Sequence, residues 1–210
     1  MSELSPSDRR GAFERLYELG APWSTGEPQS AMMHCWNQPG QIGRVLDIGC
    51  GDGANAIHIA SKGIKVVAID FVPSVVECAR ARAFERGQDV TCLVMDATTL
   101  SGWSERFDAA IDVGMLHTLP VEAVGGYVSG VRHVLNSAGV LHLMCFSDAE
   151  EMPVRTKYSR SRLLEIFQDG WLVEHIAECC FDVLVSGRLT SGPRAWYARI
   201  RKHESHSDPA

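Results

Sequence analysis

The feature that most constrains the fold is an apolar run that passes directly into three alternate glycines. The segment reads Val45-Leu46-Asp47-Ile48-Gly49-Cys50-Gly51-Asp52-Gly53. The apolar run predicts a buried strand, and the glycines predict a tight turn whose backbone can approach a ligand closely. A strand, a glycine-rich turn and a following helix are typical of a βαβ unit, which requires a parallel sheet.

The rest of the chain repeats this alternation of apolar runs and segments of helical period. We expect strands at residues 44–48, 65–69, 90–95, 109–113 and 140–146, with helices near 73–87, 124–135 and 161–168. Two strand-like runs follow at 172–185 and 195–202, separated by the turn-rich residues 186–188 and 191–193. The predicted fold class is α/β: a doubly wound, mostly parallel seven-stranded sheet with a terminal antiparallel hairpin.

Composition narrows the organisation and the partners. Residues 1–41 mix short helical pieces with Pro and Gly, residues 42–202 predict one domain, and residues 203–210 predict a disordered tail. The formal charge of −6 without a basic stripe argues against nucleic acid, and no apolar run approaches the ~18 residues of a membrane span. The N-terminus lacks the order of a secretory signal, so we expect a cytoplasmic protein. The histidines lack metal-ligand spacing, so we expect no metal.

The sequence D-I-G-C-G-D-G at residues 47–53 resembles the first motif of class I S-adenosylmethionine-dependent methyltransferases. The resemblance implies the Rossmann-like methyltransferase fold and S-adenosylmethionine as cofactor. It also implies that Asp47, Gly49, Cys50, Gly51 and Gly53 face the amino acid part of that cofactor, with Asp47 paired with its ammonium. The G-x-G-x-G spacing differs from the G-x-G-x-x-G that seats a pyrophosphate, and this cofactor has none.

Two further strand ends match family positions. Asp70 lies 21 residues after Gly49 and would accept hydrogen bonds from the ribose hydroxyls, with Phe71 or Val72 against the adenine. Asp96 would accept from the adenine amino group while the amide of Ala97 reads the ring. Each acid has a plainer interpretation: Asp70 as a solvated acid at a strand end, and Asp96 as a local turn residue.

The fourth strand is followed by Asp112-Val113-Gly114-Met115-Leu116-His117. In the small-molecule methyltransferases that this segment resembles, a D-x-G-x-x-H pattern lies beside the methyl donor. The resemblance implies that Asp112 contacts the cofactor and that Asp112 and His117 face the acceptor, where His117 would take a proton. The alternative is that His117 only packs the loop.

The stretch Pro22-Trp23-Ser24-Thr25-Gly26-Glu27-Pro28-Gln29 resembles the P-W-x-x-G-x-P-Q segment of thiopurine and thiol methyltransferase-like proteins. The resemblance implies that residues 1–41 form an N-terminal helical lid segment with Trp23 against donor and acceptor. A core anchor is the other interpretation of Trp23.

The predicted function is methyl transfer from S-adenosylmethionine to a sulfur, oxygen or nitrogen of a small molecule. One alternative keeps the cofactor and breaks another of its bonds, in cyclisation or aminocarboxypropyl transfer that releases methylthioadenosine. A less favoured alternative is an NAD-dependent oxidoreductase, because the chain lacks its glycine spacing. No motif identifies the acceptor or the oligomeric state.

Overall fold

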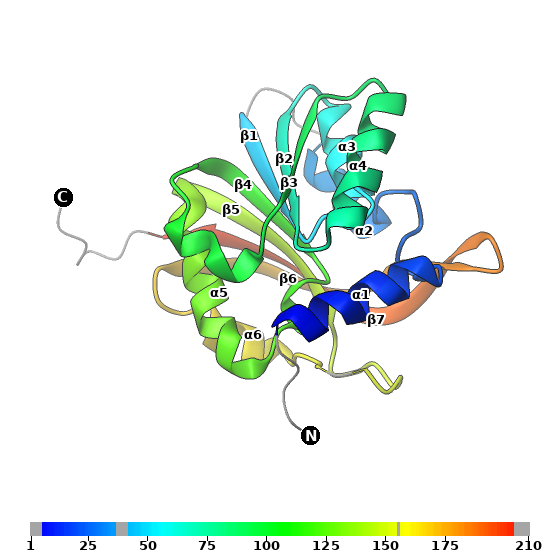
Figure 1. Ribbon diagram of the computed structural model, residues 1–210. Coiled ribbons are helices and arrows are strands. Elements are labelled where there is room, and N and C mark those ends of the chain that lie inside the picture. The colour runs from blue at the N-terminus through cyan, green and yellow to red at the C-terminus, as the bar shows by residue number, and fades with distance from the viewer. Residues whose placement is uncertain (1–5, 37–41, 155, 204–210) are drawn as a thin grey trace.

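A single seven-stranded sheet organises the protein. The computed structural model describes residues 6–36, 42–154 and 156–203. The strands run in the order β3-β2-β1-β4-β5-β7-β6, and only β7 runs against its neighbours (Figure 1). Their bounds are β1 Arg44–Ile48, β2 Lys65–Asp70, β3 Val90–Val94, β4 Phe107–Val113, β5 Leu135–Phe146, β6 Trp171–Val185 and β7 Arg188–Lys202. The predicted fold class is confirmed.

Helices cover both faces of the sheet, and each face buries its own apolar cluster (Figure 1). One cluster joins the sheet to α5 (Val121–Val134), α6 (Arg160–Ile166) and the 3₁₀ helix η2 (Ala97–Gly102). The other joins it to α3 (Ala54–Ala60), α4 (Pro73–Glu85), α2 (Ser30–Met33) and η1 (His34–Trp36). Strands buried on both faces have to be apolar throughout, which is why the sequence revealed them so clearly.

The chain reverses its strand order at β1. From β1 it builds outward to β3 and then crosses back to place β4 on the other side of β1. Ile48 pairs with Ile69 on one side and with Asp112 on the other, so the carboxyl ends of β1, β2 and β4 meet at one edge. Open α/β sheets bind their ligands in the crevice at such a switch point.

The terminal hairpin is longer than predicted. The expected second strand, 195–202, begins at Arg188, and the predicted turn at 191–193 lies inside β7. The true turn is Ser186-Gly187, with φ of 49° and 76° at its two residues, as a two-residue hairpin turn requires. Pro193 is tolerated within β7 because the register shifts between Cys180 and Asp182 of β6 and leaves it unpaired.

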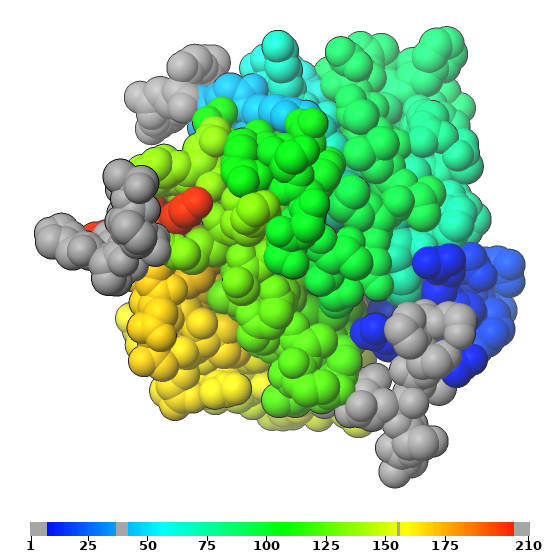
Figure 2. All heavy atoms as spheres, turned by 60° about the vertical axis from the view of Figure 1, so that its left-hand side comes forward, coloured from blue at the N-terminus to red at the C-terminus, as the bar shows by residue number. Residues whose placement is uncertain are grey.

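The N-terminal segment packs against the ligand edge of the sheet. Its first helix, α1 (Pro6–Glu18), places Phe13 edge-on to Phe71, with 5.6 Å between ring centroids. Figure 2 shows this helix in blue on the surface, beside the green middle of the chain. The tail predicted as disordered lies outside the described residues from 204 onward. No helix among the described residues is long and apolar enough to cross a membrane.

Gly53 is required for two reasons, its positive φ and its close approach to α4, and the free-energy cost of losing each can be measured separately. It has φ +80°, and a Cβ built there would lie 2.9 Å from Cβ of Ala79 in α4. Gly87 has φ +63° with nothing within 4 Å. We expect Gly87→Ala to lower the free energy of unfolding by about 1–2 kcal/mol, the conformational cost alone. Gly53→Ala adds overpacking of about 1–3 kcal/mol. Urea denaturation measures both; equal losses would contradict the close approach of α4.

Candidate active site

The glycine loop, residues 49–53, is held by the end of β2. The amides of Gly49 and Cys50 donate to the carbonyl oxygen of Ile69 at 2.8 and 2.9 Å. The amide of Gly51 donates to Asp70 Oδ2 at 3.1 Å, and that of Val72 to Oδ1 at 3.0 Å. Burial raises the pKa of Asp70 and these amides lower it. Asp70 therefore shapes the loop through these two hydrogen bonds. Each carboxylate oxygen can accept more than one hydrogen bond, so Asp70 still has capacity for the ribose hydroxyls, and this role stays a prediction.

Asp47 is a buried carboxyl group whose second oxygen has no partner. It is 1% exposed, and Oδ2 lacks a hydrogen bond to any described residue. Burial, together with the charges of Asp70, Asp112 and Asp52, raises its pKa to about 8. An unpaired buried carboxyl group is costly unless a cation meets it. Pairing of Asp47 with the ammonium of S-adenosylmethionine stays a prediction, and an unpartnered buried carboxyl oxygen is consistent with it.

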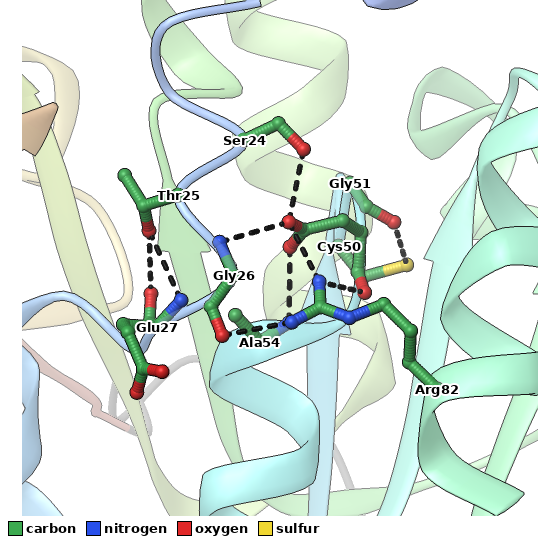
Figure 3. Close-up of polar contacts among 9 residues, drawn as sticks. Ser24, Thr25, Gly26, Glu27, Cys50, Gly51, Ala54 and Arg82 are labelled. Atoms are coloured by element: carbon green, nitrogen blue, oxygen red, sulfur yellow. Dashed lines mark hydrogen bonds and ion pairs between the residues drawn. The ribbon is translucent and has the colours of Figure 1, made fainter. Parts of the chain in front are cut away.

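Asp52 joins the N-terminal segment to the glycine loop (Figure 3). Ser24 Oγ and the amide of Gly26 donate to Asp52 Oδ2 at 2.9 and 3.2 Å. Arg82 of α4 forms an ion pair with the same oxygen at 2.7 Å and donates to the carbonyl oxygen of Gly26, also at 2.7 Å. Asp52 Oδ1 accepts from the amide of Ala54 at 3.2 Å. One carboxylate thus holds the segment over the loop.

Aromatic side chains from α1 and the following turn lie above the loop. A Cβ built on Gly51 would lie 3.1 Å from the hydroxyl of Tyr17. Tyr17 contacts Trp23 edge-on, with centroids 6.0 Å apart. Burial and the charge of Asp70 raise the pKa of the Tyr17 hydroxyl. Trp23 is 41% exposed, so the core-anchor interpretation of this residue is wrong. Its contact with the cofactor stays a prediction.

Hydrogen bonds at both ends fix the turn that carries Trp23. On one side, the carbonyl oxygen of Pro22 accepts from the amide of Leu184 in β6 at 2.8 Å. On the other, the buried Gln29 exchanges two hydrogen bonds with the backbone of Asp182, at 2.8 and 3.0 Å. The Gln of the P-W-x-x-G-x-P-Q motif is therefore an anchor to the terminal hairpin.

The end of β3 lies beside that of β2. The amide of Met95 donates to the carbonyl oxygen of Asp70 at 2.9 Å, which brings Asp96 to the same edge. Asp96 Oδ1 accepts from the amide and hydroxyl of Thr98 at 2.9 and 2.7 Å, so the local turn role is real and occupies one oxygen. The side chain of Ala97 packs into the core, which leaves its backbone for any ligand contact. The adenine roles of both residues stay predictions.

Asp112 is fully buried beneath the loop after β4. Its oxygens accept from the amide of Met115 at 2.8 Å, from that of Leu116 at 3.1 and 3.3 Å, and from the hydroxyl of Tyr127 at 2.6 Å. Burial raises its pKa to about 7, and these donors oppose the shift. This arrangement favours a positioning role, and the catalytic and cofactor roles of Asp112 stay predictions.

His117 belongs to an aromatic trio with Phe146 of β5 and Phe181 of β6. Its ring stacks on Phe146 with centroids 3.9 Å apart, and Phe181 meets both rings edge-on at 5.7 and 5.3 Å. A Cβ on Gly114, where φ is +90°, would lie 3.2 Å from Cε1 of His117. Burial lowers the pKa of His117 to about 3.

The trio adjoins the glycine loop through Met115. A Cβ built on Gly49 would lie 3.0 Å from Cβ of Met115, two residues before His117. The apolar, aromatic side of the edge therefore lies against the first residue of the glycine loop. Stacking and edge contacts of this kind are also those by which proteins recognise aromatic surfaces.

Several site residues carried no role in the sequence prediction. Asp52 stands between two glycines before a helix, which is a pattern for a helix N-terminus and a detectable signal. Phe13 and Tyr17 are four residues apart and share a helix face. Phe181 gave no signal, because a register shift in β6 orients it. Among the described residues, no group of three or more His, Cys, Asp or Glu side chains could hold a metal ion.

Comparisons with known proteins agree with this geometry. A family described as "Methyltransferase domain" matches residues 45–139. The chain is 30% identical to 2-heptyl-1-hydroxyquinolin-4(1H)-one methyltransferase of Mycobacteroides abscessus over 84% of this chain and 80% of that protein. It is 38% identical to a ubiquinone biosynthesis O-methyltransferase of Methylocella silvestris, over 47% of this chain and 38% of that protein.

Solved structures share the fold of this chain. A protein studied in the conversion of a disulfide bond into a thioacetal group during echinomycin biosynthesis aligns with a TM-score of 0.81 and 29% identity, over 92% of this chain and 93% of that one. The Burkholderia thailandensis 1,6-didemethyltoxoflavin-N1-methyltransferase, solved with 1,6-didemethyltoxoflavin and S-adenosylhomocysteine, aligns with a TM-score of 0.71 over 97% of this chain and 93% of that one. At 21% identity the latter shows the fold alone.

Asp47 makes cofactor binding depend on pH. Its pKa of about 8 leaves it protonated in the free protein at neutral pH, and pairing with an ammonium lowers that pKa. Binding therefore releases a proton, and the affinity for S-adenosylhomocysteine rises from pH 6 to 8, by up to about tenfold per unit. Calorimetry in buffers of different ionisation enthalpy measures the release. Asp47→Asn is expected to abolish it, whereas proton release that persists in this variant would assign it to Asp70 or Asp112.

Trp23 and Trp36 form a matched pair of substitutions. Trp36 is 1% exposed, so Trp36→Ala is expected to cost about 3–5 kcal/mol of stability. Trp23→Ala is expected to leave the melting temperature of the free protein nearly unchanged and to reduce the stabilisation by S-adenosylhomocysteine, which reports affinity. Thermal melts with and without S-adenosylhomocysteine distinguish these outcomes. If the ligand stabilises Trp23→Ala as much as the wild-type protein, Trp23 does not contact the cofactor.

Proposed function

The chain belongs to the S-adenosylmethionine-dependent methyltransferases, and on that premise we propose that it methylates a heteroatom on a flat aromatic small molecule. The aromatic trio carries this proposal. His117, Phe146 and Phe181 pack face to face and edge to face beside the glycine loop; Phe181 is buried, and His117 and Phe146 are partly exposed. The relative in Mycobacteroides abscessus is named for a quinolinone, which is also a fused aromatic ring.

The residues at the carboxyl edge would divide the work of binding the cofactor. Asp47 would pair with its ammonium, the loop at Gly49, Cys50, Gly51 and Gly53 would follow its amino acid part, and Asp70 would accept from the ribose. Phe71, Asp96 and Ala97 would enclose the adenine. When bound, S-adenosylmethionine supplies a methyl group already activated by its sulfonium.

The chain's contribution to the chemical step is geometric. Trp23 and Tyr17 would close over the donor and exclude water, while the trio holds the acceptor ring with its nucleophile about 3 Å from the methyl carbon. Asp112 would act indirectly, because it fixes the amides of Met115 and Leu116 and hence the loop that carries His117.

The finer affiliation, with thiopurine and thiol methyltransferase-like proteins, is part of this proposal and rests on the P-W-x-x-G-x-P-Q segment. Its support is that Pro22 and Gln29 anchor the segment at its two ends and Ser24 binds Asp52 between them. A sulfur, an oxygen and a nitrogen acceptor are all compatible with the aromatic trio.

An acceptor screen tests the function directly. We expect naphthols, hydroxyquinolines, thiophenols and aromatic amines to include substrates, read out as S-adenosylhomocysteine released. Aliphatic thiols and amines of similar size are the matched controls and should react at least tenfold more slowly, because they cannot stack. Phe181→Leu should narrow that difference. Faster turnover of the aliphatic set would contradict the aromatic site, and methylthioadenosine as product would contradict methyl transfer.

A further inference from the structure

The position of one hydrogen bond determines what His117 can do. The amide of Phe146 donates to His117 Nδ1 at 3.3 Å. A neutral imidazole has a single nitrogen lone pair that can accept a proton, and the other nitrogen carries hydrogen. Because the backbone amide occupies Nδ1, the hydrogen sits on Nε2. His117 thus presents a donor to its surroundings and has no lone pair left to serve as a base.

The surroundings keep the ring in this form. Phe146 covers one face and Phe181 meets the edge, and burial is the cause of the low pKa of about 3. The acids nearest along these elements are already occupied: Asp112 of β4 by loop amides, and Asp182 of β6, whose Oδ2 accepts from the amide of Ser30. The thiol that precedes Phe146 in β5, Cys145, is buried with its pKa raised. No described group therefore draws the proton from Nε2.

The Nε2 atom remains available to a bound molecule. His117 is partly exposed, and no described residue accepts a hydrogen bond from this atom. It lies next to Gly114, where a Cβ would stand 3.6 Å away, and a larger residue there would cover it. The ring is thus held next to Gly114 as a fixed, neutral donor.

Resting on the function proposed above, we propose that His117 positions the acceptor by donating from Nε2–H to its nucleophilic atom, and that the enzyme selects aromatic acceptors that arrive ionised. The class comprises acidic phenols, N-hydroxy heteroaromatics and heteroaromatic or aryl thiols. The acceptor anion attacks the methyl carbon, the carbon–sulfur bond breaks, and its electron pair neutralises the sulfonium. No proton has to move within the site, because the acceptor loses its proton to water before binding.

Selectivity follows from ionisation. At pH 7.5 a phenol of ordinary pKa, about 10, is only about 0.3% ionised, whereas one with a pKa near 7 is mostly anionic. A general base would remove much of this difference, since it typically contributes about 10²–10⁴-fold. Without a base, kcat/KM at neutral pH is expected to favour the acidic phenol by about a hundredfold.

Two measurements on the full-length protein test the proposal. Nitrogen-15 NMR of the imidazoles, with bound S-adenosylhomocysteine and without any acceptor, should show His117 with hydrogen on Nε2 and no titration between pH 5 and 8. Hydrogen on Nδ1, or a titration in that range, would overturn it. This measurement does not depend on turnover, so it decides the role of His117 even if no phenol is methylated, a result that would instead refute the proposed function.

The second measurement is the pH profile of kcat/KM for ring-substituted phenols with pKa values from about 7 to about 10. We expect the rise with pH to follow the pKa of each phenol. His117→Gln keeps an N–H donor near Nε2 and should retain activity within about threefold, whereas His117→Ala should lose at least tenfold, with neither variant moving the break in the profile. A break that stays fixed across the phenols and vanishes in both variants would make His117 a base and overturn the proposal.

Discussion

A buried carboxyl group costs free energy unless hydrogen-bond donors or a positive charge meet it, and this constraint organises the whole ligand edge. Asp47, Asp70, Asp96 and Asp112 stand at or just beyond the ends of β1, β2, β3 and β4. Backbone amides of the following loops converge on three of them. The loops therefore take the shapes that satisfy these carboxylates. Of these four, Asp47 alone keeps a buried oxygen without a partner among the described residues, and this is where the proposed function places the ammonium of the cofactor.

Because the loops are shaped by the protein's own carboxylates, the site is formed before any ligand arrives. The same logic extends to the N-terminal segment, where Asp52 gathers Ser24, the amide of Gly26 and Arg82 at one point. A segment with little apolar burial of its own is thereby fixed over the loop by polar contacts. Preorganisation of this kind reduces the entropy that binding would otherwise cost. It also leaves Trp23 exposed, and an edge-on contact with Tyr17 holds its ring beside the loop that the proposed function assigns to the cofactor.

Much of the sheet could be predicted because burial on both faces leaves a strand little choice of residue type, so apolar runs mark β1, β2, β4 and the part of β5 from Val140 onward. The start of β5, where residues 136–138 are exposed, has no such run and was missed. The extension of β7 to Arg188 could not, since Gly192 and Pro193 imitate a turn and only the register shift in β6 accommodates them. The strand-end acids were located correctly for a physical reason, as parallel strands bring their ends together. The hydrogen-bond donors to these acids were not predicted. Nor could the tautomer of His117 be predicted, because it depends on an amide 29 residues away in the sequence.

The distribution of charge at this edge separates binding from chemistry. Under the proposed function, Asp47 and Asp70 act on the ammonium and the ribose, whose charges are the same before and after methyl transfer. Interactions that do not change during the reaction bind donor and transition state equally and leave the barrier unaffected. The charges that do change are those of the sulfonium and the acceptor anion, and they would meet beside His117, Phe146 and Phe181. These three side chains carry no carboxylate; a carboxylate there would stabilise the positive charge of the sulfonium and so raise the barrier to methyl transfer. In an apolar, water-excluded setting, opposite charges that cancel in the product are poorly stabilised before they react. The trio would therefore assist because it adds no negative charge beside the sulfonium, while His117 Nε2–H would position the acceptor anion.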